Sequence, residues 1–355
     1  MELLERLRLL VSLTAPSGQE EDTVRFLLPK LRDAADEVTV DPLGNVIAVK
    51  KGKSGGRRLL LSAHMDEIGF IVRKVEADGY LRFEKLGGHD DRILLAQRVW
   101  VRGSKGRLAG VIGCKSAHLS GGERDKLVKH PEMYMDIGAR SAAEVAAMGV
   151  TVGDPVGYMS ELAELGLASG RFIAHGLDDR AGCALLWHLL DDLKGTELPG
   201  DLVLVFSVQE EVGLRGARTA AQAMNADVAL AVDMTAADDT PDTGTRWLQL
   251  GKGPAIKVMD NSLLAHPAMR RAMVAAAERA GVTTQAEILT GIGTDAGAIH
   301  QSGGGVVTGA LSVANRYTHS PVEMFDRADL EGAYRLLREV VLGIEGADLS
   351  FVGQA

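Results

Sequence analysis

The chain has 355 residues, of which 46% are hydrophobic and 25% are charged. This composition is typical of a globular protein and excludes wholesale disorder, a coiled coil and collagen. At roughly 150 residues per domain, the length suggests about two domains. Lys and Arg number 39 against 48 Asp and Glu, and the resulting net charge of −9 leaves no basic excess for binding nucleic acid.

Neither the cysteines nor the N-terminus indicates an exported or membrane-bound protein. Cys114 and Cys183 are too few for a disulfide framework, and Cys183 lies in an apolar helical run, where we expect it to be buried. Residues 1–13 mix charges with leucines, which is typical of an amphipathic helix and not of a signal peptide. No uncharged apolar stretch approaches the roughly 18 residues of a membrane span. We therefore expect a soluble, cytoplasmic protein.

The first third of the chain changes from one pattern to another. Helical periodicity at about 2–13 and 19–35 precedes short strands at 37–40 and 45–50, a turn at 51–56 and the apolar strand RRLLLSAH. From 67 to 165 the chain consists of short alternating segments joined by tight Gly turns, with one short helix expected at 141–148. The second pattern predicts a small β-rich domain or barrel.

After residue 170, helices and strands alternate again. The expected strands are 201–208, 227–233, 285–290 and 306–313, and the expected helices are 179–194, 214–224, 266–280 and 328–344. Such alternation predicts an α/β fold with a mostly parallel, doubly wound sheet. The β-rich segment is then an insertion of residues 67–165 into one catalytic domain made of 1–66 and 166–355.

Metal-ligand residue types follow the predicted strands. In open α/β sheets the ligand crevice lies at the carboxyl ends of the strands, so these positions are informative. The residues found there are His64, Asp66, Glu210, Glu211, Asp233 and His319, and Asp178 stands just before the 179–194 helix.

Each of these residues has an ordinary explanation when taken alone. An H-x-D pair alone is a weak signal, because such a pair arises by chance in a chain of this length. This chain holds a second one, His89 and Asp91, which we expect to lie in a loop. In a strand, however, residues i and i+2 share a face, so Asp66 can orient the His64 imidazole. Asp178 could simply cap the following helix.

The glutamate pair carries more information. Adjacent Glu210 and Glu211 would normally form a solvated turn, but here they follow the buried-looking run VLVFSV. Two neighbouring carboxylates at a crevice are costly unless they share a cation or a proton. We therefore expect one of them to bind metal and the other to act as a base.

The combination of residues is the strong signal. Two histidines and three carboxylates, each from a different element, suit Zn, Co or Mn. They are too many for one tetrahedral zinc unless one carboxylate bridges two ions. Two ions at such a site can polarise a carbonyl and generate hydroxide at neutral pH.

The sequence resembles the TET-type metallo-aminopeptidases, also called the glutamyl or deblocking aminopeptidase group. The likeness covers nearly the whole chain and rests, in order, on AHMDEIGFIV, LDDRAGCALL, FSVQEEVGLRGA, VDMTAADDTP, GIGTDAGAIH and YTHSPVE, and on the loop GCKSAHLSGGERDK at 113–126. The resemblance implies a zinc-exopeptidase-like fold and hydrolysis of the N-terminal residue from peptides.

The resemblance also implies roles for individual residues. Asp178 would bridge two divalent metal ions, His64 and Asp233 would complete the first site, and Glu211 and His319 would complete the second. Glu210 would be the general base and Asp66 the residue that orients His64. The bond between Asp178 and Asp179 would be cis. Two positions depart from the family pattern: Asp179 replaces the common Asn, and Met234 replaces a smaller aliphatic residue.

Two alternatives remain at this stage. One is a related di-metal hydrolase, either an amino-acid deacylase or a carboxypeptidase. About 110 residues separate His64 from Asp178, and this early insertion favours the aminopeptidase. The other alternative is a catalytically silent assembly protein, but every ligand and Glu210 are retained. The resemblance further implies a homo-oligomer, from a dimer to a tetrahedral dodecamer, assembled through an inserted domain without chemistry of its own.

Overall fold

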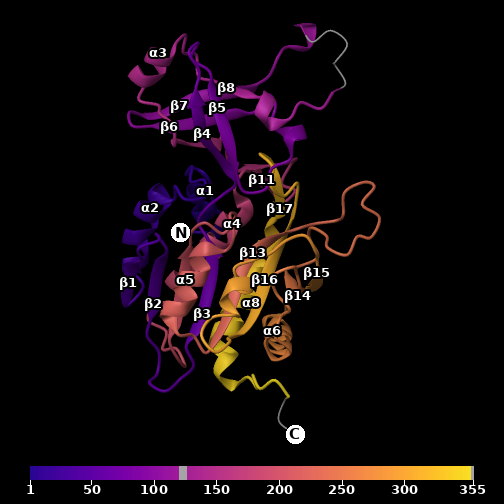
Figure 1. The fold of residues 1–355 in the computed structure, drawn as a ribbon. Coiled ribbons are helices and arrows are strands. Elements are labelled where there is room, and N and C mark those ends of the chain that lie inside the picture. The colour runs from indigo at the N-terminus through magenta and orange to yellow at the C-terminus, as the bar shows by residue number, and fades with distance from the viewer. Residues whose placement is uncertain (120–125, 353–355) are drawn as a thin grey trace.

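The computed structural model describes residues 1–119 and 126–352. A large α/β body carries a smaller β-barrel at one end (Figure 1). Residues 120–125 of the 113–126 loop lie outside the described residues. Within the described part of the chain, no helix combines the length and the apolar character that crossing a membrane requires.

The large body is built on one eleven-stranded sheet. Its main path runs through β1 (Glu37–Val40), β2 (Val46–Lys50), β12 (Leu202–Ser207), β3 (Leu59–His64), β13 (Val228–Ala236), β16 (Val307–Arg316), β17 (Glu323–Asp326), β11 (Arg171–Ala174) and β10 (Ala163–Glu164). Two further strands, β14 (Ala255–Met259) and β15 (Gln285–Ile288), branch from β16.

The sheet is mixed, with a parallel centre. β12, β3, β13 and β16 are parallel neighbours, as the helix–strand alternation predicts. The flanking pairs β1–β2 and β16–β17 are antiparallel. Their connections, residues 41–45 and 317–322, are too short for a parallel crossover, which needs a dozen or more residues. The mostly parallel arrangement therefore holds for the centre of the sheet only.

Helices cover both faces of this sheet. One face packs against α1 (Leu3–Val11), α2 (Glu21–Arg32), α4 (Leu177–Asp192), α6 (Pro267–Ala280) and α8 (Arg327–Gly343), and the other packs against α5 (Arg215–Met224) and α7 (Ala296–Ile299). Along β3, Leu61 faces the first layer and Leu60 faces the second. A strand buried on both faces must be apolar throughout, which explains the run RRLLLSAH.

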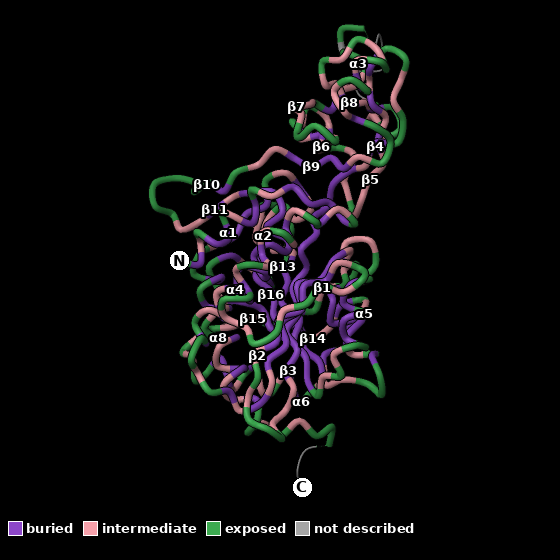
Figure 2. Tube along the Cα trace, turned by 90° about the vertical axis from the view of Figure 1, so that its left-hand side faces the viewer, coloured by how far each residue is buried: buried purple, intermediate pink, exposed green. Residues whose placement is uncertain are grey.

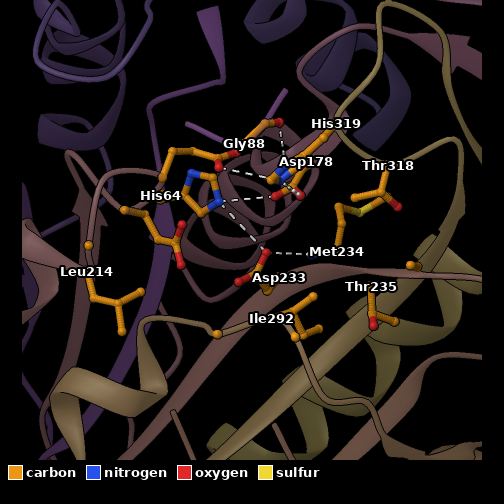
Figure 3. A pocket seen from close by; sticks show the side chains of 16 residues that line it. His64, Gly88, Asp178, Leu214, Asp233, Met234, Thr235, Ile292, Thr318 and His319 are labelled. Carbon is orange, nitrogen blue, oxygen red and sulfur yellow. Dashed lines mark hydrogen bonds and ion pairs between the residues drawn. The ribbon is translucent and has the colours of Figure 1, made fainter. Parts of the chain in front are cut away.

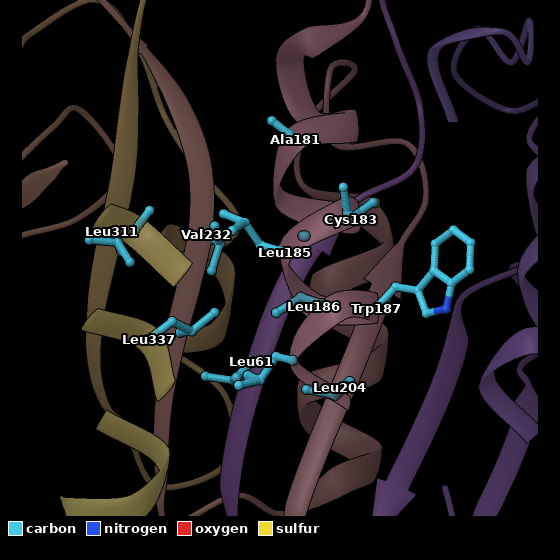
Figure 4. Packing of buried hydrophobic residues seen from close by; sticks show 14 of the residues in the cluster. Leu61, Ala181, Cys183, Leu185, Leu186, Trp187, Leu204, Val232, Leu311 and Leu337 are labelled. Atoms are coloured by element: carbon cyan, nitrogen blue, oxygen red, sulfur yellow. The ribbon is translucent and has the colours of Figure 1, made fainter. Parts of the chain in front are cut away.

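Each face of the large sheet has a hydrophobic core, and the larger of these two cores surrounds α4. Leu185 and Leu186 of this helix lie against the sheet, and Trp187 lies toward α2, where its ring meets Phe26 edge-on (Figure 4). Cys183 is fully buried in the same cluster, as the sequence predicts. Figure 2 shows the buried positions concentrated in the strands and the exposed ones in the outer loops.

The inserted segment forms a closed barrel with its own core. Its strands, in spatial order, are β4 (Gly69–Val75), β5 (Leu81–Leu86), β8 (Tyr134–Asp136), β7 (Gly106–Gly113), β6 (Arg98–Gly103) and β9 (Pro155–Tyr158). The short predicted helix is present as α3 (Ala142–Ala147). β10 pairs with β11 of the large sheet, so the last residues of the 67–165 range already belong to the α/β body.

Candidate metal centre

The structure brings six of the seven predicted site residues to one cavity of about 320 Å³. The side chains of His64, Asp178, Asp233 and His319 point toward one another (Figure 3). The cavity lies at the carboxyl edge of the parallel strands, where an α/β sheet is expected to bind its ligand. Each of the six residues comes from a strand end, a loop or the start of α4. The six are His64, Asp178, Glu210, Glu211, Asp233 and His319.

Five of these side chains form two groups that share Asp178. His64, Asp178 and Asp233 make one group, and Asp178, Glu211 and His319 make the other; within each group the potential ligand atoms lie within 4.8 Å of one another. His64 Nε2 lies 3.1 Å from Asp178 Oδ1, and His319 Nε2 lies 3.6 Å from Asp178 Oδ2. The two oxygens of Asp178 therefore face different groups, which is the arrangement of a bridging carboxylate.

Both imidazoles are oriented through the ring nitrogen that faces away from the carboxylates. His64 Nδ1 lies 3.0 Å from the carbonyl oxygen of Asp66, and His319 Nδ1 lies 3.0 Å from that of Gly88. A carbonyl can only accept, so each Nδ1 carries a proton and Nε2 is the nitrogen left to face a metal ion. This ring orientation is the one that metal ligation through Nε2 requires.

The Asp66 carboxylate holds the backbone of Glu210 and Glu211 in addition to lying near His64. It lies 3.5 Å from His64 Nδ1, farther away than the Asp66 carbonyl. The same carboxylate accepts hydrogen bonds from Ser17 Oγ (2.6 Å) and from the backbone N–H groups of Glu210 (3.0 Å) and Glu211 (3.2 Å). Asp66 lies beneath the cavity and fixes the turn that carries both glutamates.

The pKa values of two carboxyl groups at the site are shifted in opposite directions. Burial raises the pKa of Glu210, and the nearby Glu211 carboxylate adds to the rise, although the charge of His64 opposes it. Burial alone would also raise the pKa of Asp178, but its hydrogen bonds with His319 and His64 hold it below the usual value. Asp178 is therefore suited to ligation, and Glu210 to accepting a proton.

Asp178 and Asp179 form the entry to α4. Both have non-helical backbone angles, and the peptide bond between them is cis, as the family resemblance implies. The helix-capping role considered for Asp178 falls to its neighbour, because Asp179 Oδ1 accepts from Gly182 N at 2.9 Å. Asp179 Oδ2 also accepts from His64 N at 3.3 Å. The residue that departs from the family pattern thus links the helix to β3.

Glu323 is a site residue that the sequence reasoning missed. It is buried in β17, and its two oxygens accept backbone hydrogen bonds from Asp178 (3.2 Å) and from His319 (2.9 Å). One carboxylate therefore fixes two segments that carry potential ligands. The available signal was an acidic residue inside the short apolar strand that follows YTHSP.

Gly88 is a second such residue, and it belongs to the insertion. It lines the cavity, and a Cβ at this position would lie 3.1 Å from His319 Nδ1. The expectation that the insertion lacks chemistry of its own therefore needs correction, since a carbonyl from the β5–β6 loop orients His319, a potential ligand. The signal was the Gly87–Gly88 pair, which allows close backbone approach.

The second H-x-D pair does not join the site. His89 lies in a loop, as expected, and stacks on Phe70 with ring centroids 4.6 Å apart, while Asp91 pairs with Lys85. Burial lowers the pKa of His89 to about 3. Of the histidines in residues 1–119 and 126–352, only His64 and His319 line the cavity.

Comparisons with known proteins identify the family. Residues 44–336 match the family model described as M42 glutamyl aminopeptidase. A putative aminopeptidase of Acetivibrio thermocellus is 38% identical over 340 residues, which cover 96% of this chain and 98% of that protein.

Two solved structures share the fold. The aminopeptidase of the archaeon Desulfurococcus kamchatkensis has a TM-score of 0.91 at 38% identity, with 96% of this chain and 94% of that one covered. The TET1 peptidase of Pyrococcus horikoshii, described as assembling into a tetrahedron or a large octahedral shell, has a TM-score of 0.87 at 36% identity, with 96% and 99% covered. The chain therefore belongs to the M42 glutamyl aminopeptidase family and is a peptide hydrolase.

Proposed function

We propose that this aminopeptidase works with two divalent metal ions, of zinc, cobalt or manganese. His64 and Asp233 would complete one ion's ligand set, Glu211 and His319 would complete the other's, and Asp178 would bridge the two. The observation that carries the proposal is the pair of three-residue groups that share Asp178. Imidazole nitrogens and carboxylate oxygens are the donors that these metals prefer, and each group offers both.

The chain's own residues account for the proton transfers. Ions bound here would supply Lewis acidity and lower the pKa of water. Glu210, with its raised pKa, would take a proton from the water that attacks the first peptide carbonyl and would deliver it to the nitrogen of the departing peptide. Asp66 would hold the Glu210 backbone in place during these steps. The substrate would be a peptide with a free N-terminus.

Replacing Glu210 by Gln tests the proposed base. We expect turnover of aminoacyl anilides to fall by about 100- to 10,000-fold, the usual contribution of a general base, while the bound metal stays at the wild-type amount. Elemental analysis of the purified protein measures the metal. Glu197→Gln, at an exposed position paired with Lys53, is the matched control and should keep full activity.

The same assay tests the type of reaction. Metal-loaded protein should cleave peptides that have a free amine and leave their N-blocked versions intact. Equal cleavage of blocked peptides, or release of residues from the C-terminus only, would favour the related deacylase or carboxypeptidase. If Glu210→Gln kept most of its rate, Glu210 would not be the base.

We also propose that the chain forms a homo-oligomer, from a dimer to a tetrahedral dodecamer, with residues 67–165 as the dimerisation domain. The assembly described for the TET1 peptidase supports this proposal. Native mass spectrometry of the full chain tests the proposal, and a monomer at micromolar concentration would contradict it.

A further inference from the structure

The part of the cavity beyond the proposed ligands is lined by uncharged side chains. Met234 and Thr318 lie on one side of the view, Ile292 lies below them and Leu214 lies on the far side (Figure 3). Thr235 and Ala236 continue the wall along β13. Among the described residues that line the cavity there is no Lys or Arg, and each Asp or Glu is a proposed ligand or the proposed base.

A lysine lies close behind this wall but does not reach the cavity. Lys257 is fully buried, and its Nζ lies 2.5 Å from Glu287 Oε1 and 3.4 Å from Asp260 Oδ2. The Thr235 hydroxyl donates to the same Glu287 oxygen at 2.8 Å. The charge of Lys257 is thus neutralised inside the protein. The Thr235 hydroxyl already has a hydrogen-bond partner on the side away from the cavity.

These contacts predict how the cavity treats the first side chain of a substrate. An acidic side chain would lose its hydration without gaining a cation as partner, which is unfavourable. A basic side chain would find only carboxylates that are committed to metal ions, and it would be repelled by those ions. An apolar side chain would instead bury its surface against Met234 and Ile292. The Met234 thioether can adapt to side chains of different shape.

We infer that this enzyme prefers peptides whose N-terminal residue is uncharged and apolar, and that Met234 and Ile292 determine this specificity. The inference rests on the proposed function, since it takes the cavity to be where the first residue of the substrate binds. It goes further, because the family description names glutamate whereas the lining of this cavity selects against it.

A panel of aminoacyl p-nitroanilides tests the inference. With metal-loaded wild-type protein, we expect kcat/KM for the leucyl and methionyl substrates to exceed the values for the glutamyl and lysyl substrates by about tenfold or more. If either charged substrate equals or exceeds the leucyl one while free-amine dependence holds, the inference is wrong and the proposed function stands. If no free-amine substrate is cleaved, the proposed function itself fails.

Charge placed in the cavity tests the two residues directly. Ile292→Lys gives a glutamyl side chain a cationic partner, so the ratio of kcat/KM for the glutamyl substrate to that for the leucyl substrate should rise by about tenfold. Ile292→Glu should raise the corresponding lysyl-to-leucyl ratio to a similar extent. Ile292 is only partly buried in a loop, so these variants should fold; Met234→Lys at the buried position is the second test. Val274→Lys, at an exposed position of α6, is the control and should leave both ratios unchanged. Unchanged ratios in the Ile292 variants would overturn the assignment.

Discussion

At the scale of single residues, the proposed metal centre depends on groups that never touch the substrate. Asp66 fixes the glutamate turn through two backbone N–H groups, and Glu323 fixes Asp178 and His319 in the same way. Because these acceptors are buried carboxylates, their removal takes the partners from backbone donors that water does not reach. Positioning of this kind commonly changes metal affinity more than it changes the fold.

Replacing Glu323 by Gln should weaken metal binding. An amide has one acceptor oxygen where the carboxylate has two, so one of the two backbone donors loses its partner. We expect the affinity for Co²⁺ to fall by about 10- to 100-fold, as for other residues that orient metal ligands. Isothermal titration calorimetry measures this, with the exposed Glu278→Gln as control. Wild-type affinity in Glu323→Gln would show that the carboxylate does not position the ligands.

At the scale of elements, the barrel is joined to the chemistry through one loop. The β5–β6 loop brings the Gly88 carbonyl to His319, and it is held in turn by His89, whose Nε2 lies 2.8 Å from the carbonyl oxygen of Gly69. The proposed metal centre therefore takes residues from both bodies of the molecule. The inserted domain contributes to the site itself in addition to its proposed role in assembly.

Replacing Gly88 by Val should disturb one group of ligands more than the other. The added Cβ would lie 3.1 Å from His319 Nδ1, so the ring must shift and its bond to the Gly88 carbonyl weakens. We expect one of two Co²⁺ binding steps to weaken by about tenfold or more, while the other changes little. Calorimetric titration separates the two steps. Loss of both steps to the same extent would mean that Gly88 supports the whole cavity and not His319 alone.

At the scale of the whole molecule, the cluster of ionisable groups links stability to pH and to metal. Burial raises the pKa of Glu211 from 4.5 to about 7. Burial lowers the pKa of His319, but its hydrogen bond with Asp178 overcomes this effect and raises it to about 10. Without metal, the native state therefore holds protons that the unfolded state has lost, over a range from about pH 4.5 to 10. The contribution of these two groups to stability therefore falls as pH rises through that range.

Metal ions should reverse this trend, since they replace the protons on their ligands. We expect the difference in Tm between Co²⁺-loaded and chelator-treated protein to be larger at pH 8 than at pH 6. At a free metal concentration about 1,000 times Kd, binding adds on the order of 4 kcal/mol to the free energy of unfolding. Thermal unfolding followed by circular dichroism at the two pH values provides the comparison. A difference that shrinks or stays constant as pH rises would contradict the linkage.

The residue types of the site and the class of fold follow from the amino-acid sequence alone. Apolar strands that alternate with amphipathic helices predict an α/β sheet, and such a sheet collects the residues at its strand ends along one edge. His64, Glu210 and Asp233 could therefore be placed near one another before the structure was known. The barrel between 67 and 165 could be predicted because its Gly turns are local signals.

The arrangement of the strands and the contacts between the site residues depend on the tertiary structure. The order of strands, the antiparallel flanks and the sharing of Asp178 between two groups depend on contacts between segments far apart in the chain, which no local pattern encodes. Glu323 and Gly88 act through a buried carboxylate and a backbone carbonyl that could have faced any neighbour. The uncharged lining of the cavity is likewise a property of packing, because it depends on Lys257 being paired behind the wall. The chemistry of each residue can be read from the sequence, whereas the groups that it contacts depend on the fold.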